Sequence, residues 1–137
     1  MTSDSALPDG DRIDIRIPAD GVYVATLRMC AASLAARCDL TVDDIEDLRL
    51  AVDEACSLLL PHAGAGSDDA ANLDAVFTLH PGELRVQTRV AAADGAAIDQ
   101  SGFAWTVLGA LASDVSIESE RDRLSITITK RREATLP

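Results

Sequence analysis

The chain has 137 residues, of which 47% are hydrophobic and 26% charged, so it is long enough to bury one core and too apolar to be disordered. Its formal net charge of −11 disfavours direct contact with nucleic-acid phosphates or anionic lipid and favours a partner with a basic surface. The sequence has neither a signal peptide nor the roughly 18-residue apolar run that a membrane span needs, so we expect a cytoplasmic protein.

The chain begins with a predicted strand and a predicted helix. Isoleucines alternate with charged residues over residues 13–17, which is the pattern of a half-buried strand, and a proline closes it. Residues 20–37 then carry apolar side chains at helical spacing, among them Val24 and Ala31, with Asp20 as the candidate N-cap.

A second helix is predicted to follow. Thr41 and Asp44 form a capping-box pattern at its start, and a proline and a glycine after residue 60 end it. The acidic residues of its first turns spread around the helix and favour the positive end of its dipole, so capping explains them better than a divalent cation does.

The three cysteines of the chain fall in predicted helices without a C-x-x-C pair, and we expect free thiols and no metal site.

The second half of the chain predicts a hairpin, a third helix and two more strands. Residues 73–79 and 84–90 are strand-like runs joined by a short H-P-G-E turn. A third helix begins near residue 101, and strands follow at residues 115–117 and 124–129.

The order of these elements, βααββαββ, predicts an α+β fold. Neighbouring strands that form hairpins cannot make a doubly wound sheet, but they can form a two-layer α/β sandwich. We expect a mixed, mostly antiparallel sheet covered on one face by three helices. One domain over residues 11–132 holds these elements, between a flexible N-terminus of residues 1–10 and a loose tail of residues 133–137.

Several segments together give the chain a family resemblance. Residues 47–56 read D-L-R-L-A-V-D-E-A-C on the second helix, and residues 101–115 read S-G-F-A-W-T-V-L-G-A-L-A-S-D-V over the third helix and the next strand. With an arginine on the first helix, Arg28, these segments resemble anti-sigma factors of the serine-kinase type over about residues 13–130. Such proteins have the GHKL, or histidine kinase-like ATPase, fold.

The resemblance implies an ATP site and identifies its candidate residues. Glu54 matches the helix acid that positions or deprotonates the hydroxyl attacking the γ-phosphate, and a solvated carboxylate is the alternative. The D-x-G-x-G motif, whose aspartate reads adenine, is reduced here to Asp94 and Gly95. Leu58 stands where an asparagine would reach magnesium, and Ala97 where a glycine would let the backbone approach the nucleotide.

These departures, with a glycine-rich lid reduced to Ser101 and Gly102, predict a degenerate nucleotide site that holds no cofactor. ATP with magnesium remains the alternative, and the sequence leaves open whether the chain is an enzyme. Partner binding is predicted on the first helix, where the family uses an arginine matching Arg28; we assign Val24 and Ala31 to the same surface.

The resemblance thus implies an anti-sigma factor that sequesters an RNA polymerase sigma factor and is released by an anti-anti-sigma factor (STAS domain). The first alternative is an ATP-dependent serine kinase that acts on the anti-anti-sigma factor. The second is a scaffold or dimerisation domain without sigma binding, and homodimers occur in the family. The sequence names no particular sigma factor.

Overall fold

The computed structural model describes residues 7–64 and 71–133. Most of the predicted flexible N-terminus, most of the loop after the second helix and most of the predicted tail lie outside these ranges. Within them, no helix combines the length and the apolar character needed to cross a membrane.

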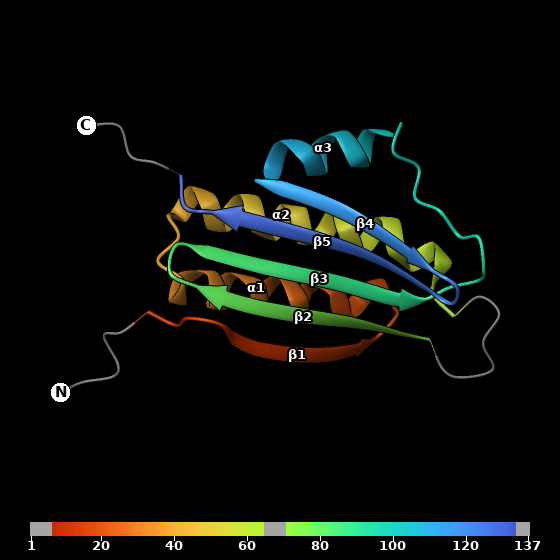
Figure 1. The fold of residues 1–137 in the computed structure, drawn as a ribbon, viewed down its shortest axis with the longest axis horizontal. Coiled ribbons are helices and arrows are strands. Elements are labelled where there is room, and N and C mark those ends of the chain that lie inside the picture. The colour runs from red at the N-terminus through yellow and green to blue at the C-terminus, as the bar shows by residue number, and fades with distance from the viewer. Residues whose placement is uncertain (1–6, 65–70, 134–137) are drawn as a thin grey trace.

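The predicted order of helices and strands is confirmed (Figure 1). In chain order the elements are β1 (Asp11–Pro18), the 3-10 turn η2 (Gly21–Tyr23), α1 (Val24–Arg37), α2 (Val42–Leu59), the 3-10 turn η3 (Leu60–His62), β2 (Asn72–His80), β3 (Glu83–Ala91), α3 (Phe103–Leu111), β4 (Asp114–Glu120) and β5 (Arg123–Arg131).

Two predicted boundaries differ from the structure by three residues or more. The first helix becomes α-helical only at Val24, because the Asp20 carboxylate accepts a hydrogen bond from the Val22 N–H at 3.1 Å and caps the 3-10 turn instead. β4 is longer than residues 115–117, since Glu120 pairs with Arg123 of β5 across a two-residue turn. The charged residues at the end of β4 therefore belong to a β-hairpin and face outward.

The five strands have the spatial order β1-β2-β3-β5-β4, and every neighbouring pair is antiparallel. The sheet is thus antiparallel throughout and not mixed, because β5 returns between β3 and β4 and runs opposite to both. The β2–β3 turn needs Gly82, whose φ of 74° is in the left-handed region.

The helices form the second layer of the sandwich. Figure 1 shows α1 and α2 behind the sheet, with α3 alongside β4. Alternate residues of the strands face these helices, and on β2 they are Leu73, Ala75, Phe77 and Leu79, all buried. None of the described helices covers the opposite face of the sheet (Figure 1).

The capping box at the start of α2 is confirmed. The Thr41 hydroxyl accepts from the Asp44 N–H and the Asp44 carboxylate accepts from the Thr41 N–H, each at 3.1 Å. Asp44 also accepts from the Glu133 N–H at 3.2 Å. Burial raises the pKa of Asp44, but the hydrogen bonds from Thr41 and Glu133 outweigh it and hold the pKa below its usual value. The ionised carboxylate therefore stabilises the fold above about pH 4, and this contribution is lost as the pH falls through the folded-state pKa.

Lys130, the only lysine of the chain, joins α2, α3 and β5. Its side chain is 12% exposed, and its ammonium donates to the Asp47 carboxylate at 3.2 Å and to the Leu111 carbonyl at 2.8 Å.

Lys130→Met keeps the aliphatic stem and removes both bonds, so we expect a loss of about 2 kcal/mol in the free energy of unfolding. Urea unfolding measures it. Arg121→Met, at an exposed position with no ion pair to a described residue, is the control, and an equal loss in both variants would contradict the assignment.

Candidate functional site

Glu54 and Leu58 lie one turn apart on α2 and define the face where the nucleotide site was predicted. Glu54 is half-buried, and its carboxylate makes no hydrogen bond or ion pair with another described residue. Leu58 is also half-buried and packs against the hydrophobic core. The position from which an asparagine would offer an oxygen to a cation is therefore apolar.

The end of α2 meets the loop that follows β3. The Gly64 N–H donates to the Ala91 carbonyl at 2.9 Å, so the segment that ends α2 and the start of residues 92–102 are adjacent. Asp94 and Gly95, however, form an exposed turn in which Gly95 has a φ of 84°. The Asp94 side chain is therefore in solvent and not at the base of a pocket.

Backbone and side-chain bonds tie this loop to the β4–β5 hairpin. The Ala92 N–H donates to the Asp122 carbonyl at 2.9 Å, and the Ser119 hydroxyl donates to the Ala96 carbonyl at 3.0 Å. Ala92 and Ile98 are buried in the core, whereas Ala97 is exposed. The loop is thus fixed by its own packing.

Asp99, which the sequence analysis did not single out, occupies the N-terminal end of α3. Its carboxylate accepts from the Ser101 hydroxyl at 2.6 Å and from the Ser101 N–H at 2.9 Å. The hydrogen bond from the Ser101 hydroxyl is the main reason that the pKa of Asp99 is lowered. The D-x-S spacing before a helix is the signal that could have identified this turn.

Arg28 lies on α1 and contacts α2. Its guanidinium donates to the Asp53 carboxylate at 2.6 Å, and the two side chains are 34% and 42% exposed. Beside this pair, burial raises the pKa of the Cys56 thiol to about 12, helped by the Asp53 charge and opposed by Arg28. Cys56 is therefore a protonated core residue, whereas the Arg28–Asp53 ion pair is partly exposed at the surface.

Val24 and Ala31 were wrongly assigned to the partner surface. Val24 is 5% exposed and Ala31 is not exposed at all, because they belong to the inward stripe of α1 with Leu27. The outward side of α1 and η2 instead presents two large apolar residues that the sequence analysis missed. Val22 is 71% exposed and Met29 is 70% exposed.

Comparisons with known proteins agree with this architecture. The family described as "Histidine kinase-like ATPase domain" matches residues 17–130, which is most of the chain. The chain belongs to the histidine kinase-like ATPase domain family. The GHKL resemblance read from α2 and α3 is thereby confirmed.

Curated relatives of this histidine kinase-like ATPase domain include two bacterial enzymes. A protein of Bacillus cereus (strain G9842) named "Serine-protein kinase RsbW" is 35% identical over 93 residues, covering 68% of this chain and 55% of the relative. One of the same name from Bacillus thuringiensis (strain Al Hakam) is 36% identical over 76 residues, covering 56% of this chain and 46% of the relative. The chain thus spans about half the length of the curated relatives it matches.

A solved structure, "The crystal structure of the RsbU and RsbW domains of Rv1364c from Mycobacterium tuberculosis", superposes on this domain with a TM-score of 0.63. The match has 18% sequence identity and covers 88% of this chain and 32% of the other. At that identity the likeness shows the fold alone, which is the predicted α+β sandwich.

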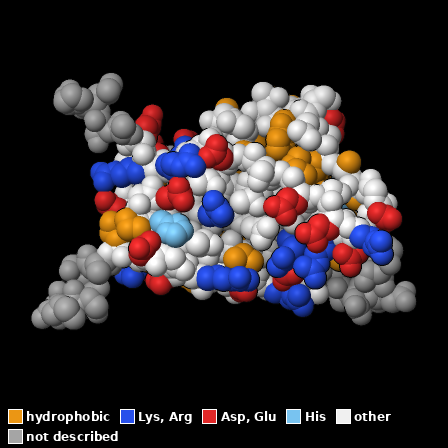
Figure 2. Space-filling model, in the orientation of Figure 1, with side chains coloured by type: hydrophobic (Ala, Val, Ile, Leu, Met, Phe, Trp, Pro, Cys, Tyr) orange, Lys and Arg blue, Asp and Glu red, His pale blue; other side chains and the backbone are white. Residues whose placement is uncertain are grey.

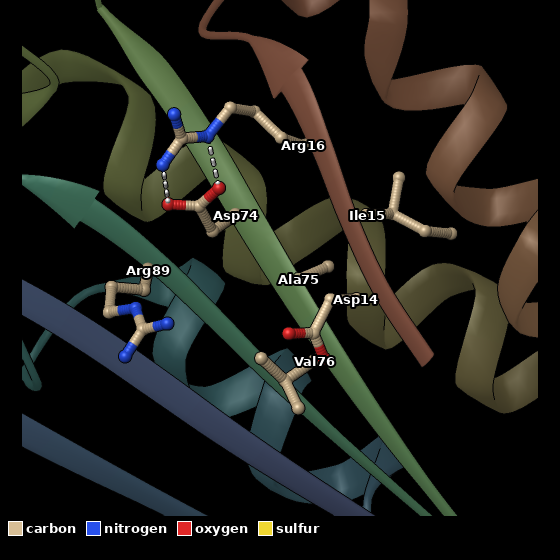
Figure 3. Close-up of a pocket in the computed structure, with 7 residues that line it drawn as sticks. All are labelled: Asp14, Ile15, Arg16, Asp74, Ala75, Val76 and Arg89. Atoms are coloured by element: carbon tan, nitrogen blue, oxygen red, sulfur yellow. Dashed lines mark hydrogen bonds and ion pairs between the residues drawn. The ribbon is translucent and has the colours of Figure 1, made fainter. Parts of the chain in front are cut away.

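The uncovered face of the sheet in this histidine kinase-like ATPase domain carries a shallow hollow of about 300 Å³ (Figure 3). Three of its four charged side chains are paired, and Arg16 donates to Asp74 at 2.7 and 3.3 Å. The fourth, Arg89, forms no ion pair with another described residue. Asp14 accepts from Arg12, which is the main reason that the pKa of Asp14 is lowered. The hollow lies on the face of the sheet opposite α1 and α2. These helices carry Arg28 and Glu54, so the hollow forms no part of the candidate site.

Proposed function

We propose that this chain is an anti-sigma factor whose α1 surface binds an RNA polymerase sigma factor. An anti-anti-sigma factor with a STAS domain would compete for the same surface and release the sigma factor. The observation that carries the proposal is the combination on α1 and η2 of a fixed, half-exposed arginine with two exposed apolar side chains. Because the chain spans about half of its curated relatives, the proposal concerns this domain.

The geometry around Arg28 suits a protein contact. Asp53 already holds the guanidinium in one orientation, so less side-chain entropy is lost when a partner binds. Val22 and Met29 add exposed apolar area on η2 and α1, and arginines with apolar residues around them are common centres of binding energy. The net charge of −11 would speed the approach of the basic surface of a sigma factor.

The same proposal includes loss of the nucleotide. Leu58 brings a hydrocarbon surface to the place of a magnesium ligand, and Asp94 is exposed in its turn. Asp99 places a negative charge at the N-terminal end of α3, where it would repel a phosphate. Among the described residues, no group of three or more His, Cys, Asp or Glu side chains could hold a metal ion. These residues do not fit Mg-ATP, and we propose that the domain acts without it.

Two measurements test the proposal separately. Titration calorimetry with Mg-ATP is expected to show no binding, meaning a Kd above about 1 mM, and a Kd below about 100 μM would refute the loss of the nucleotide. Light scattering of the chain mixed with each purified sigma factor of the cell is expected to find a one-to-one complex. Failure with all of them would leave the scaffold as the better description.

A serine kinase is the second candidate function. The curated relatives of this chain are named serine-protein kinases. The Glu54 carboxylate, which is not paired with another described residue, lies on the face of α2 where the family places its acid. Transfer of radioactive phosphate from ATP to a STAS protein, lost in Glu54→Gln, would establish this function.

A further inference from the structure

The edge of the sheet formed by β4 has an unusual neighbour. Among the described strands β4 pairs only with β5, so its other side forms an edge of the described sheet. Figure 1 shows α3 alongside this edge, whereas α1 and α2 lie behind strands. The helix layer therefore extends past the last strand, and a sixth strand added to β4 would lie beneath α3 as the other strands lie beneath α1 and α2.

The composition of α3 indicates that it is incompletely covered. Its nine residues, Phe103–Leu111, include no charged residue, and only Leu108 is buried. Phe103, Val107 and Ala110 have the spacing of one helix face and are not packed against the core, and Phe103 is 83% exposed. Hydrophobic side chains are visible along the boundary between α3 and β4 (Figure 2). A helix this apolar is normally buried on more than one side.

The side chains of β4 add a charge pattern to this apolar surface. Val115 and Ile117 face the helix layer and are half-buried, while Asp114, Glu118 and Glu120 are exposed on the other face of the sheet. Asp114 pairs with Arg131 at 2.5 Å. Glu118 and Glu120 form no ion pair or hydrogen bond with another described residue, so their carboxylates are available to an incoming cation.

We propose that β4 and α3 form a docking groove for an extended segment of a partner protein in which basic and aliphatic residues alternate. The segment would add a sixth strand to β4 and satisfy its free backbone groups. Its aliphatic side chains would pack under α3 beside Val115 and Ile117. Its basic side chains would lie opposite Glu118 and Glu120 on the uncovered face of the sheet.

Charge selects this occupant over a second copy of the chain. Antiparallel pairing of two β4 strands centred on Ile117 would place Asp114 of each copy opposite Glu120 of the other, which is repulsive. The opposite edge strand, β1, offers a basic segment no such site, because Arg12 pairs with Asp14 and Arg16 with Asp74. The acidic edge beside an apolar helix is thus specific to β4.

A synthetic peptide tests the groove on the full chain. The probe has seven residues, the length of β4, with arginine and valine alternating, and the control peptide has the same composition without the alternation. We expect the alternating peptide to bind at least about tenfold more tightly, as measured by fluorescence anisotropy. Hydrogen exchange should slow at the β4 amides and not at those of β1.

Matched charge reversals locate the peptide. Glu118→Lys is expected to weaken binding at least about fivefold, and Asp14→Lys, an outward reversal on the opposite edge strand, less than about twofold. Equal effects of the two variants, equal binding of both peptides, or protection at β1 would overturn the proposal. So would a homodimer in light scattering that Glu118→Lys dissociates. Arg28→Glu should leave peptide binding unchanged, which separates this groove from the proposed sigma-factor surface.

Discussion

Arg28→Glu is expected to weaken sigma-factor binding by at least about 100-fold, or about 2.7 kcal/mol. The substitution removes the cation that Asp53 holds at 2.6 Å and places a second carboxylate beside that aspartate. The surface then carries two negative charges where the partner would meet a fixed arginine. Reversing a charge at a desolvated contact commonly costs several kcal/mol of binding free energy. Titration of each variant with the purified sigma factor, by calorimetry or anisotropy, gives the ratio of affinities.

The control for this prediction lies on the same helix. Arg37, in the last turn of α1, is exposed and has no ion pair with a described residue, so Arg37→Glu changes the net charge equally. We expect it to weaken binding less than about threefold. Circular dichroism checks that both variants fold. An Arg28→Glu protein that binds within threefold of the unaltered chain would remove α1 from the interface.

The order of elements could be predicted because each carried a local signal of its own. Alternating isoleucines marked β1, the capping box marked α2, and a short turn with a glycine marked the β2–β3 hairpin. β4 was underestimated because its C-terminal residues Glu118 and Glu120 lack hydrophobic alternation. Their strand conformation depends on pairing with β5, which is a contact that no local pattern encodes.

The candidate site was less predictable from the sequence. Val24 and Ala31 belong to an apolar stripe at helical spacing, and such a stripe already indicates burial. The partner-binding role of the first helix was therefore assigned to its buried side. Val22 and Met29, which lie off that stripe, were the better candidates. Asp99 was missed because its hydrogen bonds to Ser101 depend on how the loop turns into α3.

Phe77→Ala is expected to destabilise the domain by about 3–5 kcal/mol. Phe77 lies on β2 between Ile13 of β1 and Val86 of β3, faces the helices and is not exposed at all. Truncation removes the largest fully buried side chain of the core and leaves a cavity that a rigid sheet cannot close. The thermal midpoint should fall by roughly 10 °C for a domain of this size.

Phe103→Ala gives the matched control, because the chain has only two phenylalanines and Phe103 is 83% exposed. Removing it takes little surface out of the folded core, so we expect a change within about 0.5 kcal/mol. The same variant should weaken binding of the alternating peptide to the β4 groove, since Phe103 belongs to the uncovered face of α3. A large loss of stability in Phe103→Ala would mean that this face is already buried within the chain, and the groove would then have no room for a sixth strand. One pair of phenylalanine variants therefore tests both the core of the sandwich and the open edge beside it.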